Sequence, residues 1–155
     1  MSANVRLHGD QLIASRQLDA DPDLIWTMFT TPAHLAAFWG GDHAAVTPGS
    51  VLVDLRVGGT FELETAGPDD STHRLSFRYD EIDPPNRLVL TEPHTGLTTA
   101  ISLRASAGGT SVIIHQRRLP PELRTEQART GLAGILRRLG VVADELSDRE
   151  RRRDR

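Results

Sequence analysis

The chain has 155 residues, which suits a single domain, and its 38% hydrophobic and 25% charged residues are typical of a globular protein. It contains no cysteine, which excludes disulfides, thiolate catalysis and cysteine-based zinc sites. The net charge of −3 argues against general nucleic-acid affinity, and the chain shows neither a secretory signal nor an apolar run of about 18 residues, so we expect a cytoplasmic protein without a membrane span.

The first half of the chain predicts a strand followed by two short helices. Residues 1–10 are expected to form a flexible N-terminus, and residues 11–19 alternate loosely between apolar and polar, as a strand does. Asp21 is a suitable N-cap for a short helix with Pro22 at its first position. A second short helix is expected over residues 32–39.

Six further strands are expected between the short helices and a final helix. Leu75, Phe77 and Tyr79 alternate with polar residues at a period of two, which is the signal of a strand with one buried face. Glycine- or proline-rich turns separate the runs, and Gly108-Gly109 predicts a hairpin between the last two. The expected strands cover residues 51–57, 61–65, 75–79, 87–91, 97–105 and 110–118.

The last part of the chain predicts one long amphipathic helix. Apolar residues recur every three or four positions from Ala128 to Leu146, which indicates a helix of about 25 residues and about 37 Å. Residues 147–155 are expected to form an arginine-rich tail in solvent. The element order predicts a single α+β domain over residues 11–146, in which a curved antiparallel sheet of about six to seven strands wraps around the final helix.

Three segments resemble a known superfamily. Residues 21–26, 54–61 and 79–91 are similar to the first helix, the strand with its Gly-Gly bend, and the strand–turn–strand of SRPBCC or START-like proteins, which share the helix-grip fold of the birch-pollen allergen. Together the segments resemble the branch of heat-shock-protein ATPase activator homologues. In two places the chain departs from the branch: residues 38–41 read Phe-Trp-Gly-Gly in place of Trp-Trp-Gly-Pro, and Gly131-Leu132 replaces Gly-Trp. The resemblance implies a helix-grip fold with an internal ligand cavity.

The candidate ligand-binding residues are those expected between the sheet and the helices. Packing in an ordinary core is the alternative for each of them, and the glycines of the last helix fit either a ligand or a closely packed sheet. The candidates are Met28, Phe38, Trp39, Phe61, Phe77, Tyr79, His115, Gly131, Leu132 and Ile135.

The sequence offers little support for catalysis. The histidines show no HxH or HExxH spacing, so we expect no metal, and we find no nucleotide- or phosphate-binding loop, so we expect no cofactor. The only candidate acid–base residues are His115 and Tyr79. His115 shares the parity of Ile113 on its strand, and either an inward or a surface position is compatible with that pattern.

The sequence favours a non-enzymatic protein that binds an apolar or polycyclic small molecule, such as a lipid or a polyketide, in an internal cavity. Two alternatives remain open. One is a polyketide cyclase-type or self-resistance protein that sequesters a toxic metabolite or is sacrificed to it. The other, motivated by the resemblance, is a co-chaperone-like interaction module. We expect a monomer or a homodimer.

Overall fold

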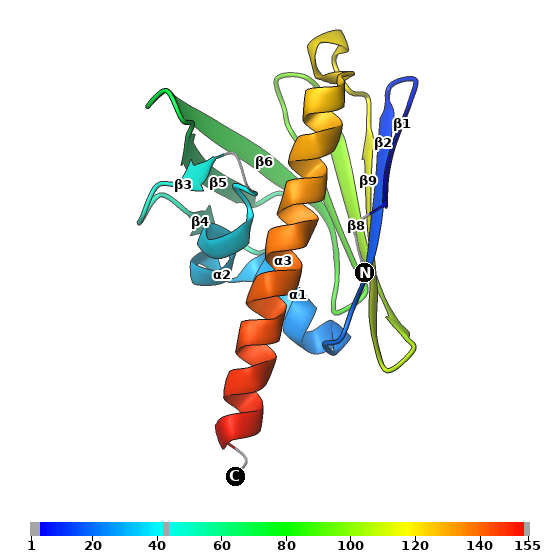
Figure 1. The fold of residues 1–155 in the computed structure, drawn as a ribbon. Coiled ribbons are helices and arrows are strands. Elements are labelled where there is room, and N and C mark those ends of the chain that lie inside the picture. Colours follow the sequence, from blue (N-terminus) through cyan, green and yellow to red (C-terminus); the bar gives the residue numbers. More distant parts are fainter. Residues whose placement is uncertain (1–3, 42–43, 154–155) are drawn as a thin grey trace.

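The computed structural model describes residues 4–41 and 44–153, which form a curved antiparallel sheet gripping one long helix (Figure 1). The expected helix-grip α+β fold is confirmed. The helical elements are α1 (Pro22–Thr30), α2 (Pro32–Phe38), the 3-10 turn η1 (Pro121–Leu123) and α3 (Glu126–Arg153). The strands are β1 (Asn4–His8), β2 (Gln11–Leu18), β3 (Ala45–Val46), β4 (Leu52–Val53), β5 (Thr60–Ala66), β6 (Thr72–Asp83), β7 (Arg87–Thr91), β8 (Thr98–Ser106) and β9 (Gly109–Arg117).

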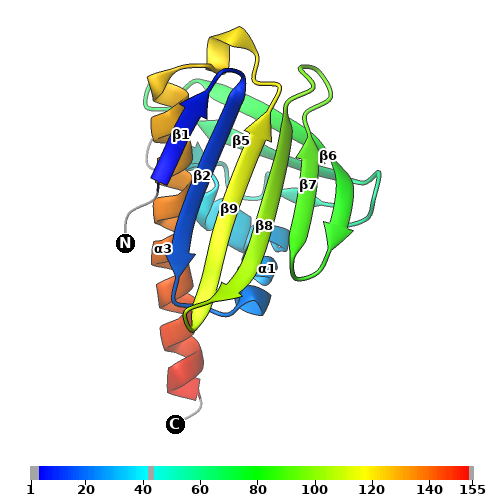
Figure 2. The same ribbon diagram turned by 90° about the vertical axis from the view of Figure 1, so that its right-hand side faces the viewer.

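The strands follow the order β1-β2-β9-β8-β7-β6-β5-β3, and β4 also pairs with β5. Every pairing is antiparallel. In Figure 2 the outer face of strands β1, β2, β9, β8 and β7 is turned to the viewer, and α3 lies behind β1 and β2. The sheet therefore has one solvated convex face and one concave face that holds the helices, which is the arrangement expected of an antiparallel sheet with alternating side chains.

The core lies between the concave face and α3. The helix buries Leu132, Leu136, Leu139 and Ala143, which recur at the spacing of one helical face. In strands β7, β8 and β9 every second side chain points at that face, because a strand has a period of two. Buried residues of the strands and of all three helices form one core cluster.

Both predicted termini need correction. Asn4–His8 is a strand and not part of a flexible segment, since it pairs with β2 in register from Asn4↔Ser15 to His8↔Gln11 and buries Val5. At the other end, α3 continues to Arg153, so the expected tail is helical over residues 147–153. Arg151 pairs with Asp148 one turn earlier at 3.2 Å, and basic residues in the last turn favour the negative end of the helix dipole.

The expected strand over residues 51–57 is reduced to Leu52–Val53. Beyond Val53 the chain makes a tight turn, in which Gly59 N donates to Arg56 O at 2.8 Å and Gly58 adopts φ +84°. Leu55 and Val57 are 41% and 65% exposed, because the turn directs them away from the core. The apolar alternation of this segment thus reflects an exposed loop.

No helix within residues 4–41 and 44–153 is both long enough and apolar enough to cross a membrane.

Candidate functional site

Aromatic side chains from α2, β5 and β6 meet on one part of the concave side. The centroid of the Trp39 ring lies 5.2 Å from that of Phe61 and 6.2 Å from that of Phe77, in edge-to-face geometry, and the two phenylalanine rings stack at 5.6 Å. Phe38 contacts Trp39 at 6.3 Å and extends the cluster to Phe29 at 5.3 Å. The sequence candidates Phe38, Trp39, Phe61 and Phe77 are therefore brought together, and we call them, with Phe29, the aromatic cluster.

Tyr79 follows Phe77 on the same face of β6, and its hydroxyl is a buried polar group. Its side chain is 1% exposed, and its hydroxyl has no hydrogen-bond partner among the described residues. Burial raises the pKa of this hydroxyl well above its ordinary value, and the charge of Asp54 raises it further. Tyr79 is consequently neutral and presents an unused donor to the interior, where a buried polar group normally finds a partner.

A row of inward-facing side chains crosses the concave face from Tyr79. We call it the inward row, and its members are Tyr79, Leu90, Thr99 and Gln116. Tyr79 is in register with Leu90 of β7, Leu90 with Thr99 of β8, and Thr99 with Gln116 of β9. Thr99 is 3% exposed, and Gln116 Nε2 donates to Thr99 Oγ1 at 3.4 Å. The sequence analysis missed Thr99 and Gln116. Their parity with Ile101 and Ile114 was the available signal, because residues two apart on a strand share a face.

Arg16 is the charged residue on the concave face of β2. Its Nη1 donates to the carbonyl of Leu136 in α3 at 2.9 Å, and its Nε has no partner among the described residues. A Cβ placed on Gly140 would lie 2.5–2.7 Å from the guanidinium atoms of Arg16. This helix glycine therefore makes room for an arginine of the sheet, and the close-packing interpretation holds for it.

Near the N-terminal end of α3, Gly131 and the glycine that packs against the helix, Gly41, differ in how much space surrounds them. A Cβ on Gly41 would lie 3.1 Å from Ile135 N and 3.2 Å from the carbonyl carbon of Gly134, so the segment after α2 packs tightly on α3. A Cβ on Gly131 would have no heavy atom within 4 Å among the described neighbours. Close packing against α3 thus explains the glycine at position 41, whereas packing against the described neighbours does not explain Gly131.

The remaining sequence candidates divide into buried and outward positions. Met28 and Leu132 are buried at 0% and 6% exposure, and Ile135 is half-buried against the same core. His115 lies on the convex face: its inward neighbour Ile114 is buried, while its own ring accepts or donates a hydrogen bond with Gln11 Oε1 at 2.8 Å. The prediction that His115 lines the cavity together with Tyr79 is wrong, because the two side chains lie on opposite faces of the sheet.

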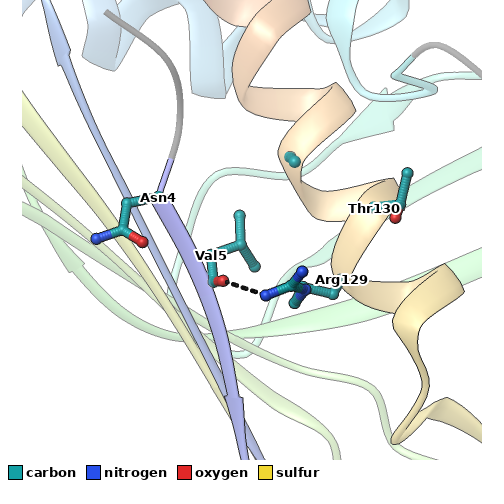
Figure 3. A pocket seen from close by; sticks show the side chains of 5 residues that line it. Asn4, Val5, Arg129 and Thr130 are labelled. Carbon is teal, nitrogen blue, oxygen red and sulfur yellow. Dashed lines mark hydrogen bonds between the residues drawn. The ribbon is translucent and has the colours of Figure 1, made fainter.

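Several hollows open on the surface of the described residues. The first, of about 320 Å³, lies between β1 and α3, where Arg129 Nη1 donates to Val5 O at 3.3 Å (Figure 3). Four others open elsewhere on the described surface, and the aromatic cluster lines none of these five. The rings of the cluster contact one another, so a ligand that binds between them has to separate them.

A family model described as "Activator of Hsp90 ATPase homolog 1-like protein" matches residues 19–144. Solved structures share the fold. A protein from Rhodobacter sphaeroides aligns with a TM-score of 0.80 and 24% identity over 94% of this chain and 99% of that one. A protein from Chromobacterium violaceum gives 0.80 and 25% over 87% and 98%, and an AHSA1-like protein from Aeromonas hydrophila gives 0.74 and 19% over 88% and 94%. No curated protein sequence matches the chain.

Proposed function

We propose, from the premise that this chain belongs to the family of Activator of Hsp90 ATPase homolog 1-like proteins, that it binds an apolar or polycyclic small molecule between the concave face and α3. The observation that carries the proposal is the Tyr79 hydroxyl, which is buried beside the aromatic cluster without a partner among the described residues. An unpartnered buried donor costs free energy, and a ligand with an acceptor atom removes that cost. The ligand therefore combines an apolar body with at least one acceptor oxygen.

The aromatic cluster supplies the apolar contacts for this ligand. Burial of apolar surface contributes about 25 cal/mol per Å², and edge-to-face aromatic contacts add to it. Trp39 is the half-buried member of the cluster and contacts both Phe61 and Phe77. We infer that the ligand enters by displacing Trp39 and the end of α2, since Trp39 is half-buried whereas Phe61 and Phe77 are buried.

The first experiment is native mass spectrometry of the protein purified from its own host, in search of a co-purifying small molecule. The second is a titration of Trp39 fluorescence in a Trp26→Phe background, with a long-chain fatty acid, a sterol and a polycyclic aromatic ketone as probes. We expect at least one probe to change the emission and to raise the melting temperature. If no molecule co-purifies and no probe shifts either signal, the proposal is refuted.

Tyr79→Phe tests the polar contact within the same assay. A hydrogen bond of about 1 kcal/mol corresponds to an affinity loss of about fivefold for the acceptor-bearing probe. A hydrocarbon of the same shape without the oxygen provides the matched control, because its affinity does not depend on the hydroxyl. Equal losses for both probes would show that the variant disturbs packing, and would remove Tyr79 from the site.

The cyclase-type alternative loses its main candidate. His115 lies on the outer face, so Tyr79 is the remaining acid–base candidate of the two, and its raised pKa opposes a role as a base at neutral pH. A conversion assay with a linear polyketide model substrate tests this directly. Turnover that survives Tyr79→Phe would require a different catalytic group.

Exposed apolar side chains favour the co-chaperone-like interaction module as a second candidate function. The family description names an ATPase activator, and β4 and the loop after it expose three apolar side chains: Leu52 at 54%, Leu55 at 41% and Val57 at 65%. Exposed apolar groups of this kind suit a protein contact. Stimulation of the ATPase rate of the host's Hsp90 by wild-type protein, and its loss in Leu55→Ser/Val57→Ser, would establish that function.

A further inference from the structure

A hollow of about 380 Å³ opens on the convex face of the sheet, away from α3 and from the aromatic cluster. The hollow is separate from the proposed ligand site, because the side chains that line it point away from the concave face, on which the inward row of Tyr79, Leu90, Thr99 and Gln116 lies. The residues that line it are Arg78, Asp80, Thr91, Thr98, Arg117 and Arg118.

Four of these residues form one row across four neighbouring strands. Arg78 of β6 is in register with Thr91 of β7, Thr91 with Thr98 of β8, and Thr98 with Arg117 of β9. With strands about 4.8 Å apart, three steps place the two arginine backbones about 14 Å from each other. The threonine hydroxyls between them lie 3.4 Å apart. The row thus presents a guanidinium on each side of a pair of hydroxyls.

The arginine on the β6 side is held in place. Arg78 Nε donates to Asp80 Oδ1 at 2.9 Å, and Asp80 Oδ2 accepts a hydrogen bond from Thr91. A β-bulge between Tyr79 and Glu81 shifts the register there and directs Asp80 to the convex face beside Arg78. Partial burial raises the pKa of Asp80, but the hydrogen bonds from Thr91 and Arg78 outweigh it and leave the pKa below its ordinary value. Asp80 is therefore ionised and fixes Arg78.

The arginines on the β9 side have no such partner. Neither Arg117 nor Arg118 makes a side-chain hydrogen bond or ion pair with the part of the chain that the structure describes. Arg118 also adopts φ +58°, a left-handed conformation that is uncommon outside glycine. With Asp80 as the sole carboxylate of the lining, three guanidinium groups leave a formal charge of +2 in the hollow.

We propose that this convex-face hollow binds a doubly charged phosphate group carried by a small molecule. The charge of the lining matches that of a phosphate dianion, and guanidinium groups recognise its oxygens with paired hydrogen bonds. The volume exceeds what a bare ion needs and lies in the range of small-molecule pockets, so a phosphate monoester is the expected ligand class.

Isothermal titration calorimetry at low salt tests this with inorganic phosphate and glycerol 3-phosphate as probes, and with glycerol as the uncharged control. Two variants are compared with the wild type: Arg117→Gln/Arg118→Gln in the hollow, and Arg152→Gln/Arg153→Gln on exposed positions of α3 outside it. Both double variants change the net charge equally. Thr98→Val serves as a third variant and a control, because it keeps every charge and removes a hydroxyl that donates to Gly96 O at 3.1 Å.

We expect the wild type, the α3 variant and Thr98→Val to bind glycerol 3-phosphate more tightly than phosphate. We expect the β9 variant to lose at least tenfold in affinity. Unchanged melting temperatures verify that the variants fold. Equal losses in the two arginine variants would reduce the effect to overall charge and overturn the proposal, as would an absence of heat with the wild type. Vesicles with and without phosphatidic acid separate a lipid phosphate from a soluble one: retention only on phosphatidic acid vesicles, lost in the β9 variant, would assign the site to a lipid headgroup.

Discussion

Removal of a single oxygen tests whether the interior is built around a ligand. Tyr79 is 1% exposed and its buried hydroxyl lacks a partner among the described residues, which costs about 1–3 kcal/mol. Tyr79→Phe removes that cost and keeps the ring. Taking the lower end, we expect the free energy of unfolding to increase by about 1 kcal/mol, and the melting temperature of a domain of this size to rise by about 2–4 °C.

The assay is chemical and thermal unfolding of protein that has been denatured, stripped of bound molecules and refolded. Thr110→Val is the matched control, since Thr110 is equally buried but its hydroxyl donates to Ala20 O at 2.6 Å, so its loss should destabilise the protein by about 1 kcal/mol. If Tyr79→Phe destabilises the stripped protein as Thr110→Val does, the hydroxyl is already satisfied inside, by ordered water for example, and the argument for a ligand acceptor fails.

Three further predictions concern the glycines and His115. Gly140→Ala should destabilise the wild-type protein, because the new Cβ would lie 2.5 Å from the Arg16 guanidinium, but should stabilise an Arg16→Met variant by about 1 kcal/mol, where only helix propensity remains. Gly131→Ala should stabilise the protein directly, because a Cβ there has no neighbour within 4 Å. A double-mutant cycle by urea unfolding tests this, and a lack of coupling between residues 16 and 140 would contradict it. Gly59→Ala should cost more than about 2 kcal/mol, because the new Cβ would lie 2.2 Å from the backbone oxygen of Asp54, and a near-neutral result would show that the turn after β4 relaxes easily. Burial, and then the charges of Arg117 and Arg87, lower the pKa of His115 below 6.5. The folded state therefore binds fewer protons there than the unfolded state, and stability falls as the pH drops below about 6.5. An NMR titration should show a higher imidazole pKa in Arg117→Gln, and an unchanged pKa would exclude that charge as a cause.

The candidate site was predictable where a side chain's direction follows from strand period alone. Phe61, Phe77 and Tyr79 were found because each lies in a strand with a clean period of two and one buried face. His115 was misjudged because its strand is apolar at both parities, with Ile113 exposed and Ile114 buried. Nothing in the sequence of β9 says which of these faces the helix; the pairing with β2 and β8 does.

The arginines show a second limit of sequence reasoning. Arg16 and Arg78 are the same residue type and both lie in strands. Arg16 nevertheless lies under α3 against Gly140, whereas Arg78 lies on the convex face beside Asp80. The convex-face row of Arg78, Thr91, Thr98 and Arg117 joins positions up to 39 residues apart, and it exists only through the register of three strand pairings and one bulge.

The sequence alone determined the succession of a strand, two short helices, further strands and a long helix. It also determined the burial of one face of the last helix and the resemblance to the helix-grip fold, since each depends on local periodicity and on motifs read along the chain. The tertiary structure decided which polar groups face inward, which glycines serve packing, and that the rings of the aromatic cluster touch one another. The physical reason is that register and the approach of α3 to the sheet are set by contacts between distant segments, and those contacts leave no local pattern in the chain.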